Sequence, residues 1–540
     1  MFFCLIGCQP QAENDFEKAA SEISITKMHQ HIETLSSDAF GGRAPASEGE
    51  IKTIEYIIDQ FKELGVEPGN GDSYVQEVPL VEIESDVQKT MQIKLTGKSL
   101  ELELSNEFVG ASPHLTENIQ ISDSEVVFAG YGIVAPEYQW NDYENIDVKG
   151  KTVVVLVNDP GFTSEDSTLF TGKMMTYYGR WTYKFEEAAK QGATAVLVVH
   201  ETAPASYGWA VVQKALSGTM YDLAMDDGNA SKCAFEGWLS YDASIKLFGS
   251  IGMDLEELKI AATKRDFTAI ATGAKMSIEV KNKWKSSVSN NVAGLIKGTE
   301  YPDEYLFFMG HWDHLGSENI QDETLIYNGA QDNATGIAGL IELARAFKAL
   351  PNGPKRSVVI LPVTAEERGL LGSKYYAENP IFPMNKVVAG VNIDMLNVYG
   401  PTNDIIAVGY GLSELDEYLF EASKLQSRSV KPDQKPEAGG FYRSDHFNFA
   451  KKGVPMLYLK QGTEHVEKGK DWLSEQTSNF NANIYHTVDD TYDPNWDLDG
   501  AVQDLKLIFY IGYKLSEDRS FPQYKPGTEF RAIREQMVEK

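Results

Sequence analysis

The sequence is short of cysteine, of long apolar runs and of positive charge. Only three cysteines occur in 540 residues, so the fold cannot depend on a framework of disulfide bonds. No apolar run reaches the roughly 20 residues that a membrane-spanning helix needs. The 79 acidic residues outnumber the 49 basic ones and give a net charge of -30. This balance argues against nucleic acid or an anionic membrane as a partner.

The N-terminus "MFFCLIGCQPQAEN" is apolar up to Cys8 and polar after it. Its "LIGC" resembles the lipobox of bacterial lipoproteins, whose cysteine is lipidated after the signal is cleaved. The resemblance implies a signal over residues 1–8, cleaved before Cys8, and a lipid anchor on Cys8 as the only contact with a membrane. The protein would then lie at the bacterial cell envelope, on the periplasmic or extracellular face. A short frayed apolar terminus is the alternative.

A chain of this length exceeds one ordinary hydrophobic core, so we expect two or three domains. The texture changes near Glu125 to short β-rich segments such as "EVVFAGYGI" and "KTVVVLVND". We therefore expect an inserted β-rich domain within a larger one. The expected order is a linker over 9–22, the first part of the main domain over 23–124, the insertion over 125–275, the core of the main domain over 276–520 and a tail over 521–540.

Apolar runs and helical patterns alternate after residue 276. The runs "YLFFMG", "SVVILPVT", "VVAGVNIDM", "DIIAVG" and "VPMLYL" are continuous apolar strands, and "ATGIAGLIELARAFKAL" is a helix between two of them. This alternation predicts an α/β fold with a sheet covered by helices on both faces. Near the N-terminus, "SEGEIKTIEYIIDQFKELG" predicts an amphipathic helix with a capping box of Ser47 and Glu50 and a stop at Gly65.

Several of these strands end in a residue that can bind metal. The residues at or just after strand ends and helix starts are His311, Asp313, Asp332, Glu366, Glu367, Asp394 and His486. In open α/β sheets, sites form at the carboxyl ends of the strands, so these side chains can converge although they lie far apart in the sequence. The neighbouring glutamates of "VTAEERGLLGS" can then be aimed at two different atoms.

The donors are nitrogen and carboxylate oxygen without cysteine, which suits a catalytic zinc site with an open position for water. One aspartate can bridge two ions, because a carboxylate has two oxygens. Three carboxylates, Asp332, Glu367 and Asp394, and a bound hydroxide would balance two dications. A single dication would leave this cluster unbalanced. The charge count therefore favours two Zn2+ ions.

The motifs "GHWDHLG", "GAQDNATG", "TAEERGLLGS", "NIDM", "RSDHFNF" and "YHTVDDT", in this order, resemble the di-zinc aminopeptidases of metallopeptidase family twenty-eight. The resemblance extends to "LSSDAFGGRAPASEGEIKTIEYIIDQFKELGVEPG". It implies a mixed, mostly parallel sheet sandwiched by helices, the zinc aminopeptidase or phosphorylase/hydrolase-like fold. The inserted block resembles the protease-associated domain of many members, and we expect it to restrict entry to short peptides.

The resemblance also implies roles for single residues. His311 and Asp394 would hold one zinc, Glu367 and His486 the other, and Asp332 would bridge them. Glu366 would be the general base, and Asp313 the carboxylate that orients His311. Tyr485 matches a position where some relatives stabilise the tetrahedral oxyanion.

Ser444, Asp445 and His446 match a loop that helps to wall the substrate pocket, and they receive no chemical role. The remaining histidines have no such partners and are expected to be structural or exposed: His29, His31, His114, His200, His314 and His465. The glycines of "GYGI" and "FGGRAP" are expected to form turns, since a phosphate cradle requires a helix immediately after it.

The leading function is a hydrolase that removes N-terminal residues from peptides. Two alternatives stay open. Glutaminyl cyclase shares this fold but uses one zinc and an intramolecular attack. A binding protein on an inactive peptidase scaffold, as in transferrin-receptor-like proteins, would lack ligands or the base. This chain keeps the five ligands and the base, which favours hydrolysis. The sequence makes no prediction of oligomeric state or of the preferred side chain.

Overall fold

The computed structural model describes residues 9–164, 166, 168–321 and 323–538. Within these residues the chain divides into two compact units. Unit 1 contains the described residues up to Val78, the segment Val288–Gln434 and the segment from Arg443 onward. Unit 2 contains Pro79–Ser287 and Lys435–Tyr442. Cys8, the predicted lipidation site, lies outside the described residues.

Unit 1 is built on a mixed sheet that has eight strands in the described part of the chain. Their order is β1 (Glu67–Pro68), β14 (Gly294–Ile296), β18 (Arg356–Val363), β15 (Tyr301–His311), β19 (Val387–Asn392), β22 (Met456–Lys460), β20 (Asp404–Val408) and β21 (Ser429–Pro432). The central pairs β18/β15, β15/β19 and β19/β22 are parallel. The predicted α/β class with a mixed sheet is therefore confirmed.

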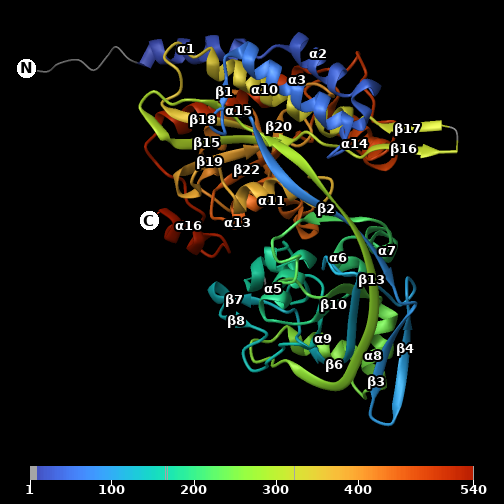
Figure 1. Ribbon diagram of the computed structural model, residues 1–540. Helices are drawn as coiled ribbons and strands as arrows, with labels where there is room; N and C mark the ends of the chain where they lie inside the picture. The colour runs from blue at the N-terminus through green and yellow to red at the C-terminus, as the bar shows by residue number, and fades with distance from the viewer. Residues whose placement is uncertain (1–8, 165, 167, 322, 539–540) are drawn as a thin grey trace, which may run out of the picture. The chain divides into compact units, whose positions relative to one another are not determined.

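Helices cover both faces of this sheet (Figure 1). One face packs against α1 (Gln9–Ser21), α2 (Ile25–Leu35), α3 (Glu48–Leu64), α10 (Thr335–Lys348), α12 (Leu415–Leu425) and α15 (Asp499–Glu517). The other face packs against α11 (Leu371–Glu378), α13 (His446–Lys451) and α16 (Arg531–Val538). Within β15, Leu306 and Phe308 enter the first core, whereas Phe307 and Met309 enter the second. This alternation is why the central strands read as continuous apolar runs.

Two segments that were expected to lie outside the main domain are folded into unit 1. The predicted linker over 9–22 forms α1, because Phe16 stacks on Phe509 with ring centroids 5.3 Å apart and Ala19 and Ala20 are buried. The predicted tail over 521–540 contains α16. Its Arg534 is buried and donates to the backbone oxygens of Val387 and Val388. The sequence pattern alone did not indicate these tertiary contacts.

The amphipathic helix predicted near the N-terminus is α3, and only half of its capping box forms. The Ser47 Oγ atom accepts from the N–H groups of Gly49 and Glu50 at 3.1 and 3.3 Å. The Glu50 side chain instead accepts from the backbone N–H of Ala46, the Ser289 hydroxyl and the Asn290 amide. Gly65 ends the helix in the left-handed conformation, as predicted.

Unit 2 is wider than the predicted insertion over 125–275. Its sheet has ten strands among the described residues: β11 (Met220–Leu223), β2 (Val75–Val87), β13 (Ile270–Val292), β6 (Asn118–Phe128), β9 (Thr152–Leu156), β10 (Ala195–Val199), β12 (Phe235–Leu239), β5 (Phe108–Ala111), β3 (Thr90–Leu95) and β4 (Lys98–Glu103). The difference arises because β2, β3 and β5 precede residue 125 and pair with strands that follow it, and β4 pairs with β3.

Helices accompany the strands of unit 2, so this unit is not purely β. They are α4 (Pro160–Thr163), α5 (Trp181–Lys190), α6 (Thr202–Ala205), α7 (Trp209–Leu216), α8 (Tyr241–Ser250) and α9 (Leu255–Ala262). The parallel strands β6, β9 and β10 lie next to one another in its sheet. Among the helices that the structure describes in either unit, none has the length and apolarity to cross a membrane.

Candidate metal centre

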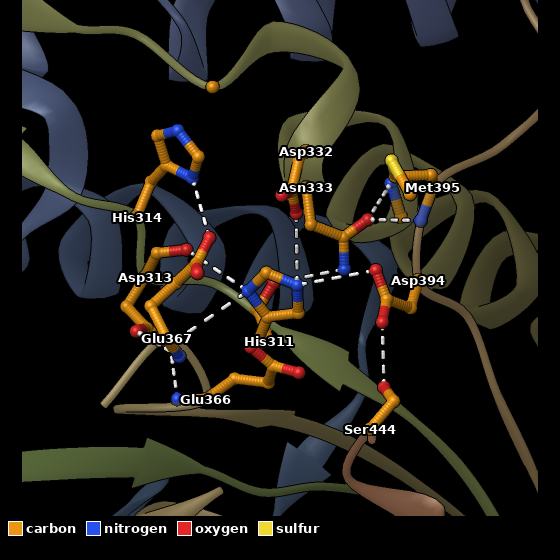
Figure 2. A network of polar contacts seen from close by, with 12 residues as sticks. His311, Asp313, His314, Asp332, Asn333, Glu366, Glu367, Asp394, Met395 and Ser444 are labelled. Atoms are coloured by element: carbon orange, nitrogen blue, oxygen red, sulfur yellow. Dashed lines mark hydrogen bonds and ion pairs between the residues drawn. The ribbon is translucent and has the colours of Figure 1, made fainter. Parts of the chain in front are cut away.

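The predicted metal ligands and Glu366 come together at the carboxyl ends of the central strands of unit 1. Figure 2 labels all of them except His486. His311 is the last residue of β15, and Asp332 lies in the short turn η5 (Ala330–Ala334) before α10. Glu366 and Glu367 lie in the loop after β18. Asp394 follows β19, and His486 follows the turn η9 (Phe480–Ile484). Different strands and loops thus supply the side chains of one cluster, as the positions at strand ends predicted.

Asp332 lies between the two histidines of the cluster. Its Oδ1 atom is 3.2 Å from Nε2 of His311, and its Oδ2 atom is 3.1 Å from Nε2 of His486. Each histidine also contacts a second carboxylate. Nε2 of His311 is 3.5 Å from Oδ1 of Asp394, and Nε2 of His486 is 3.1 Å from Oε2 of Glu367. The contacts therefore form two histidine–carboxylate pairs joined by one aspartate.

The neighbouring glutamates face different donor groups. Glu367 lies with His311 and Asp332 in one set of mutually close donor atoms, and Glu366 lies with His311 and Asp394 in another. The carboxylate of Asp313 fixes the backbone of this pair. Its oxygens accept from the N–H groups of Glu366 and Glu367 at 3.1 and 3.4 Å. The turn after β18 therefore directs the two side chains apart, as expected for adjacent residues at a strand end.

Asp313 contacts His311 chiefly through its main chain. Nδ1 of His311 is 3.1 Å from the backbone oxygen of Asp313 and 3.9 Å from its carboxylate. The backbone carbonyl is thus the nearer partner that fixes the imidazole, while the carboxylate holds the Glu366–Glu367 turn. Burial raises the pKa of Asp313 to about 6.

Ser444 contacts a predicted ligand directly. Its hydroxyl donates to Oδ2 of Asp394 at 2.7 Å and accepts from the Asn392 amide at 2.8 Å. Asp445 and His446 are buried at the start of α13. The loop that was predicted to wall the pocket thus orients Asp394 through Ser444.

Tyr485 lies beside the cluster. Its ring stacks on His486 with centroids 3.9 Å apart, and 39% of the residue is exposed. Burial and the nearby carboxylates hold the pKa of its hydroxyl well above the ordinary value. The hydroxyl is therefore a hydrogen-bond donor at neutral pH.

The sequence reasoning did not find Asn333, which joins the loops of the cluster. Its Nδ2 atom donates to the backbone oxygens of His311 and Ile393 at 3.2 and 3.0 Å. Its Oδ1 atom accepts from the N–H groups of Gly336 and Met395, both at 3.0 Å. All four hydrogen bonds of one amide are thus made (Figure 2). Its place after Asp332 in "GAQDNATG" was the available signal.

Arg43 of "FGGRAP" was also missed, since only a turn was predicted there. The turn exists, and Gly42 adopts a φ of +67° within it. The buried guanidinium donates to the backbone oxygens of Trp312, Asn328 and Gly329 at 2.6 to 2.9 Å. It thereby ties the segment after His311 to the segment before Asp332. Burial lowers the pKa of Arg43 to about 10, and the site carboxylates oppose this shift.

The carboxylates and histidines of the cluster shift one another's pKa values. Burial would raise the pKa of Asp332, but hydrogen bonds from His311 and His486 lower it to about 2. Burial lowers the pKa of His486, but Asp332 and Glu367 reverse this and raise it to about 10. Burial, with the charge of Asp394, raises the pKa of Glu366 well above its ordinary value. The carboxylate oxygens and imidazole nitrogens of the cluster form a donor set that suits zinc.

The α/β sheet and the buried donor cluster at its carboxyl edge define a candidate metal-dependent hydrolase. Comparison with known proteins agrees with this class: residues 291–509 match the model of Peptidase family M28. This match covers the cluster and less than half of the chain. It supports an enzyme of the metallopeptidase class.

Curated relatives cover only parts of the chain. A mouse protein, Aminopeptidase NAALADL1, is 30% identical over 28% of this chain and 19% of its own length. A Caenorhabditis elegans protein, Glutamate carboxypeptidase 2 homolog, is 29% identical over 34% of this chain and 26% of its own length. Aminopeptidase YwaD of Bacillus subtilis is 23% identical over 43% of this chain and 46% of its own length. The chain thus spans less than half the length of these relatives.

Among solved structures, an aminopeptidase from Aneurinibacillus sp. strain AM-1 is 19% identical, with a TM-score of 0.48. The alignment covers 95% of this chain and 97% of that one. A zinc aminopeptidase from Bacillus subtilis is 17% identical, with a TM-score of 0.41. This alignment covers 91% of this chain and 94% of that one.

Proposed function

We propose that this protein is a di-zinc aminopeptidase that removes N-terminal residues from peptides. The observation that carries the proposal is the arrangement about Asp332, whose two carboxylate oxygens each contact a different histidine. Each of these histidines is paired with a further carboxylate. Such a division of donors suits two cations that share one aspartate.

The residues would divide as follows: His311 and Asp394 for one zinc, Glu367 and His486 for the other, and Asp332 for both. When bound, the zinc pair would supply a water activated at neutral pH and would polarise the scissile carbonyl. Glu366, whose donor atom lies close to those of His311 and Asp394, would act as the general base. It would take the proton of the attacking water and pass it to the nitrogen of the leaving amine as the C–N bond breaks.

Two neighbours would assist the substrate. The Tyr485 hydroxyl remains protonated and can donate to the oxygen on which negative charge develops. Ser444, through its hydrogen bond, fixes the orientation of Asp394. The free amine at the N-terminus of a peptide would be anchored at the zinc pair. A peptide whose terminus is acetylated lacks this free amine.

The decisive experiment combines zinc analysis with a matched pair of substrates. We expect two zinc ions per chain, hydrolysis of leucine p-nitroanilide and almost none of N-acetyl-leucine p-nitroanilide. A protein that contains one zinc and releases ammonia from peptides with N-terminal glutamine would be a glutaminyl cyclase. Removal of C-terminal residues from acetylated peptides would indicate a carboxypeptidase. Failure to bind zinc or to turn over any peptide would favour the inactive binding scaffold.

We also propose that Cys8 carries a lipid anchor at the bacterial cell envelope. The support is the "LIGC" sequence alone. A Cys8→Ser form, expressed in its own cell type, should move from the membrane fraction to the soluble fraction. A native form that is already soluble and retains residues 1 to 8 would contradict the anchor.

A further inference from the structure

His314 is a buried histidine that belongs to the metal centre and has no assigned role. It follows His311 by three residues in "HWDHLG", and its side chain has no exposed surface. Its Nδ1 atom lies 2.8 Å from Oε1 of Glu367 (Figure 2). Nothing in the sequence separates it from the histidines expected to be structural or exposed.

The direction of this hydrogen bond follows from its acceptor. A carboxylate that binds a cation is ionised and can only accept a hydrogen bond, so Nδ1 of His314 carries the proton when Glu367 serves as a ligand. The opposite nitrogen, Nε2, is buried and has no hydrogen-bond partner among the described residues. A buried unpaired nitrogen is unfavourable, so the contact with Glu367 must compensate for it.

The surrounding backbone leaves the imidazole little freedom. The N–H of His314 donates to the backbone oxygen of Arg43 at 3.2 Å. Gly329, which has a φ of +55°, lies against the ring: a β-carbon there would lie 2.5 Å from Cγ of His314. Only glycine fits this position without strain. The imidazole is thus packed closely against the backbone at Gly329.

Holding Oε1 of Glu367 determines the position of its other oxygen. Oε2 lies 3.1 Å from Nε2 of His486, on the side of the donor cluster. A glutamate side chain in a loop would otherwise lose rotamer freedom each time it bound a cation. With Oε1 engaged by His314, the carboxylate is already oriented for binding through Oε2.

We propose that His314 is a positioning residue that orients Glu367 as a zinc ligand through an Nδ1–H···Oε1 hydrogen bond. This inference rests on the proposed function. Outer partners of metal ligands typically contribute about 10–100-fold to metal affinity, because they fix the ligand and increase its basicity. His314 would therefore act on zinc binding without touching zinc or substrate.

Two amide variants separate this role from simple packing. In His314→Asn, the side-chain NH2 takes the place of Nδ1 and can still donate to Glu367, although the shorter side chain leaves a gap. In His314→Gln, the volume is better preserved, but the NH2 takes the place of Nε2, which points away from Glu367. A positioning role thus predicts that His314→Asn binds zinc better than His314→Gln, and a packing role predicts the opposite order.

The measurement is a zinc titration of the full-length metal-free protein against a chromophoric chelator. We expect the affinity of His314→Gln to fall by about 10–100-fold and that of His314→Asn to stay near the wild-type value. Unchanged affinity in His314→Gln, equal losses in both variants or a greater loss in His314→Asn would overturn the inference. A wild-type protein that binds no zinc would instead refute the proposed function.

A second measurement needs no variant and covers the case in which His314→Gln does not fold. In zinc-loaded wild-type protein labelled with 15N-histidine, we expect His314 to be the Nδ1–H form, with that proton protected from exchange. Finding the proton on Nε2 alone would show that Nδ1 does not donate to Glu367 and would contradict the inference.

Discussion

Asp490 holds Asp332 by its backbone: Oδ2 of Asp490 accepts a hydrogen bond from the N–H of Asp332 at 3.1 Å. Its Oδ1 accepts from the N–H of Gln331 at 2.9 Å. Asp490 is buried and follows His486 by four residues. One loop thus carries a proposed zinc ligand and also fixes the aspartate at the centre of the cluster.

Asp490→Asn should weaken both the fold and zinc binding. Only one oxygen of the amide can accept, so one buried N–H loses its partner, at a cost of about 1–3 kcal/mol. We expect a lower unfolding midpoint for the metal-free protein and a lower zinc affinity, measured by calorimetry and chelator competition. Asp489→Asn is the matched control, since Asp489 is exposed. Equal effects of the two changes would contradict the role of Asp490.

The adjacent glutamates should fail differently when each is changed to glutamine. Glu366→Gln should lose about 10²–10⁴-fold or more in kcat and keep near-normal zinc content and KM, because the amide cannot accept a proton at neutral pH. Glu367→Gln should lose zinc. Zinc stoichiometry and peptidase kinetics of both variants provide the check. If the Glu366→Gln variant stayed active, the assignment of Glu366 as general base would be wrong. If it lost zinc while Glu367→Gln retained zinc, both assignments would be wrong.

Asn333→Asp should be strongly destabilising although it replaces a single atom of the side chain. The new oxygen would face the backbone oxygens of His311 and Ile393, where Nδ2 now donates. Loss of these two buried hydrogen bonds should cost at least about 2 kcal/mol. Denaturant unfolding measures this loss. Asn352→Asp adds the same charge at an exposed position and should change stability little; a similar loss in both would point to charge alone.

Glu342 should make the stability of unit 1 depend on pH. It is buried on α10 and accepts from the N–H of Ser24, which caps α2, at 2.8 Å and from Arg345 at 3.0 Å. Burial raises its pKa, but the contacts with His31, Ser24 and Arg345 lower it below the ordinary 4.5. A lowered folded-state pKa adds stability above about pH 4.5, and this stability is lost as pH falls through the folded-state value.

Glu342→Gln removes this charge and tests its effect. The unfolding midpoint of the wild type should exceed that of Glu342→Gln at pH 7, and the difference should shrink below pH 4. The expected loss at pH 7 is about 1–3 kcal/mol for hydrogen bonds to a buried charge. A difference that stays constant from pH 7 to pH 3 would mean that the ionised form contributes nothing.

The sequence predicted the sheet and the cluster because both depend on local patterns. A strand buried on both faces reads as a continuous apolar run, and β18 shows this in "RSVVILPV". A polar residue at the end of such a strand, such as His311, must lie at the sheet's carboxyl edge. Glu366 and Asp394 followed from the same rule, and Asp332 from its place just before a helix.

Contacts between distant segments could not be predicted in this way. The buried Arg43 lies more than 260 residues from Trp312, whose backbone oxygen it binds. His314 resembles the other histidines until the fold brings Glu367 to within 2.8 Å. The helix α1 has a mostly polar sequence, and only the stacking of Phe16 on Phe509 reveals its place. The local pattern of apolar and polar residues does not indicate which distant residues will be in contact.

Unit 2 is composed of two separate stretches of chain, and this complicates its removal by protein engineering. The short stretch Lys435–Tyr442 is anchored within it: the N–H of Met175 donates to the oxygen of Pro436 at 3.2 Å, and the rings of Tyr177 and Tyr442 lie 6.3 Å apart. A truncation that removes only Pro79–Ser287 would leave residues 435–442 without their packing partners. This octapeptide ends two residues before Ser444. A loss of activity in such a truncated protein could then arise from displacement of this loop as well as from the missing unit. Removal of unit 2 must therefore also redesign residues 435–442.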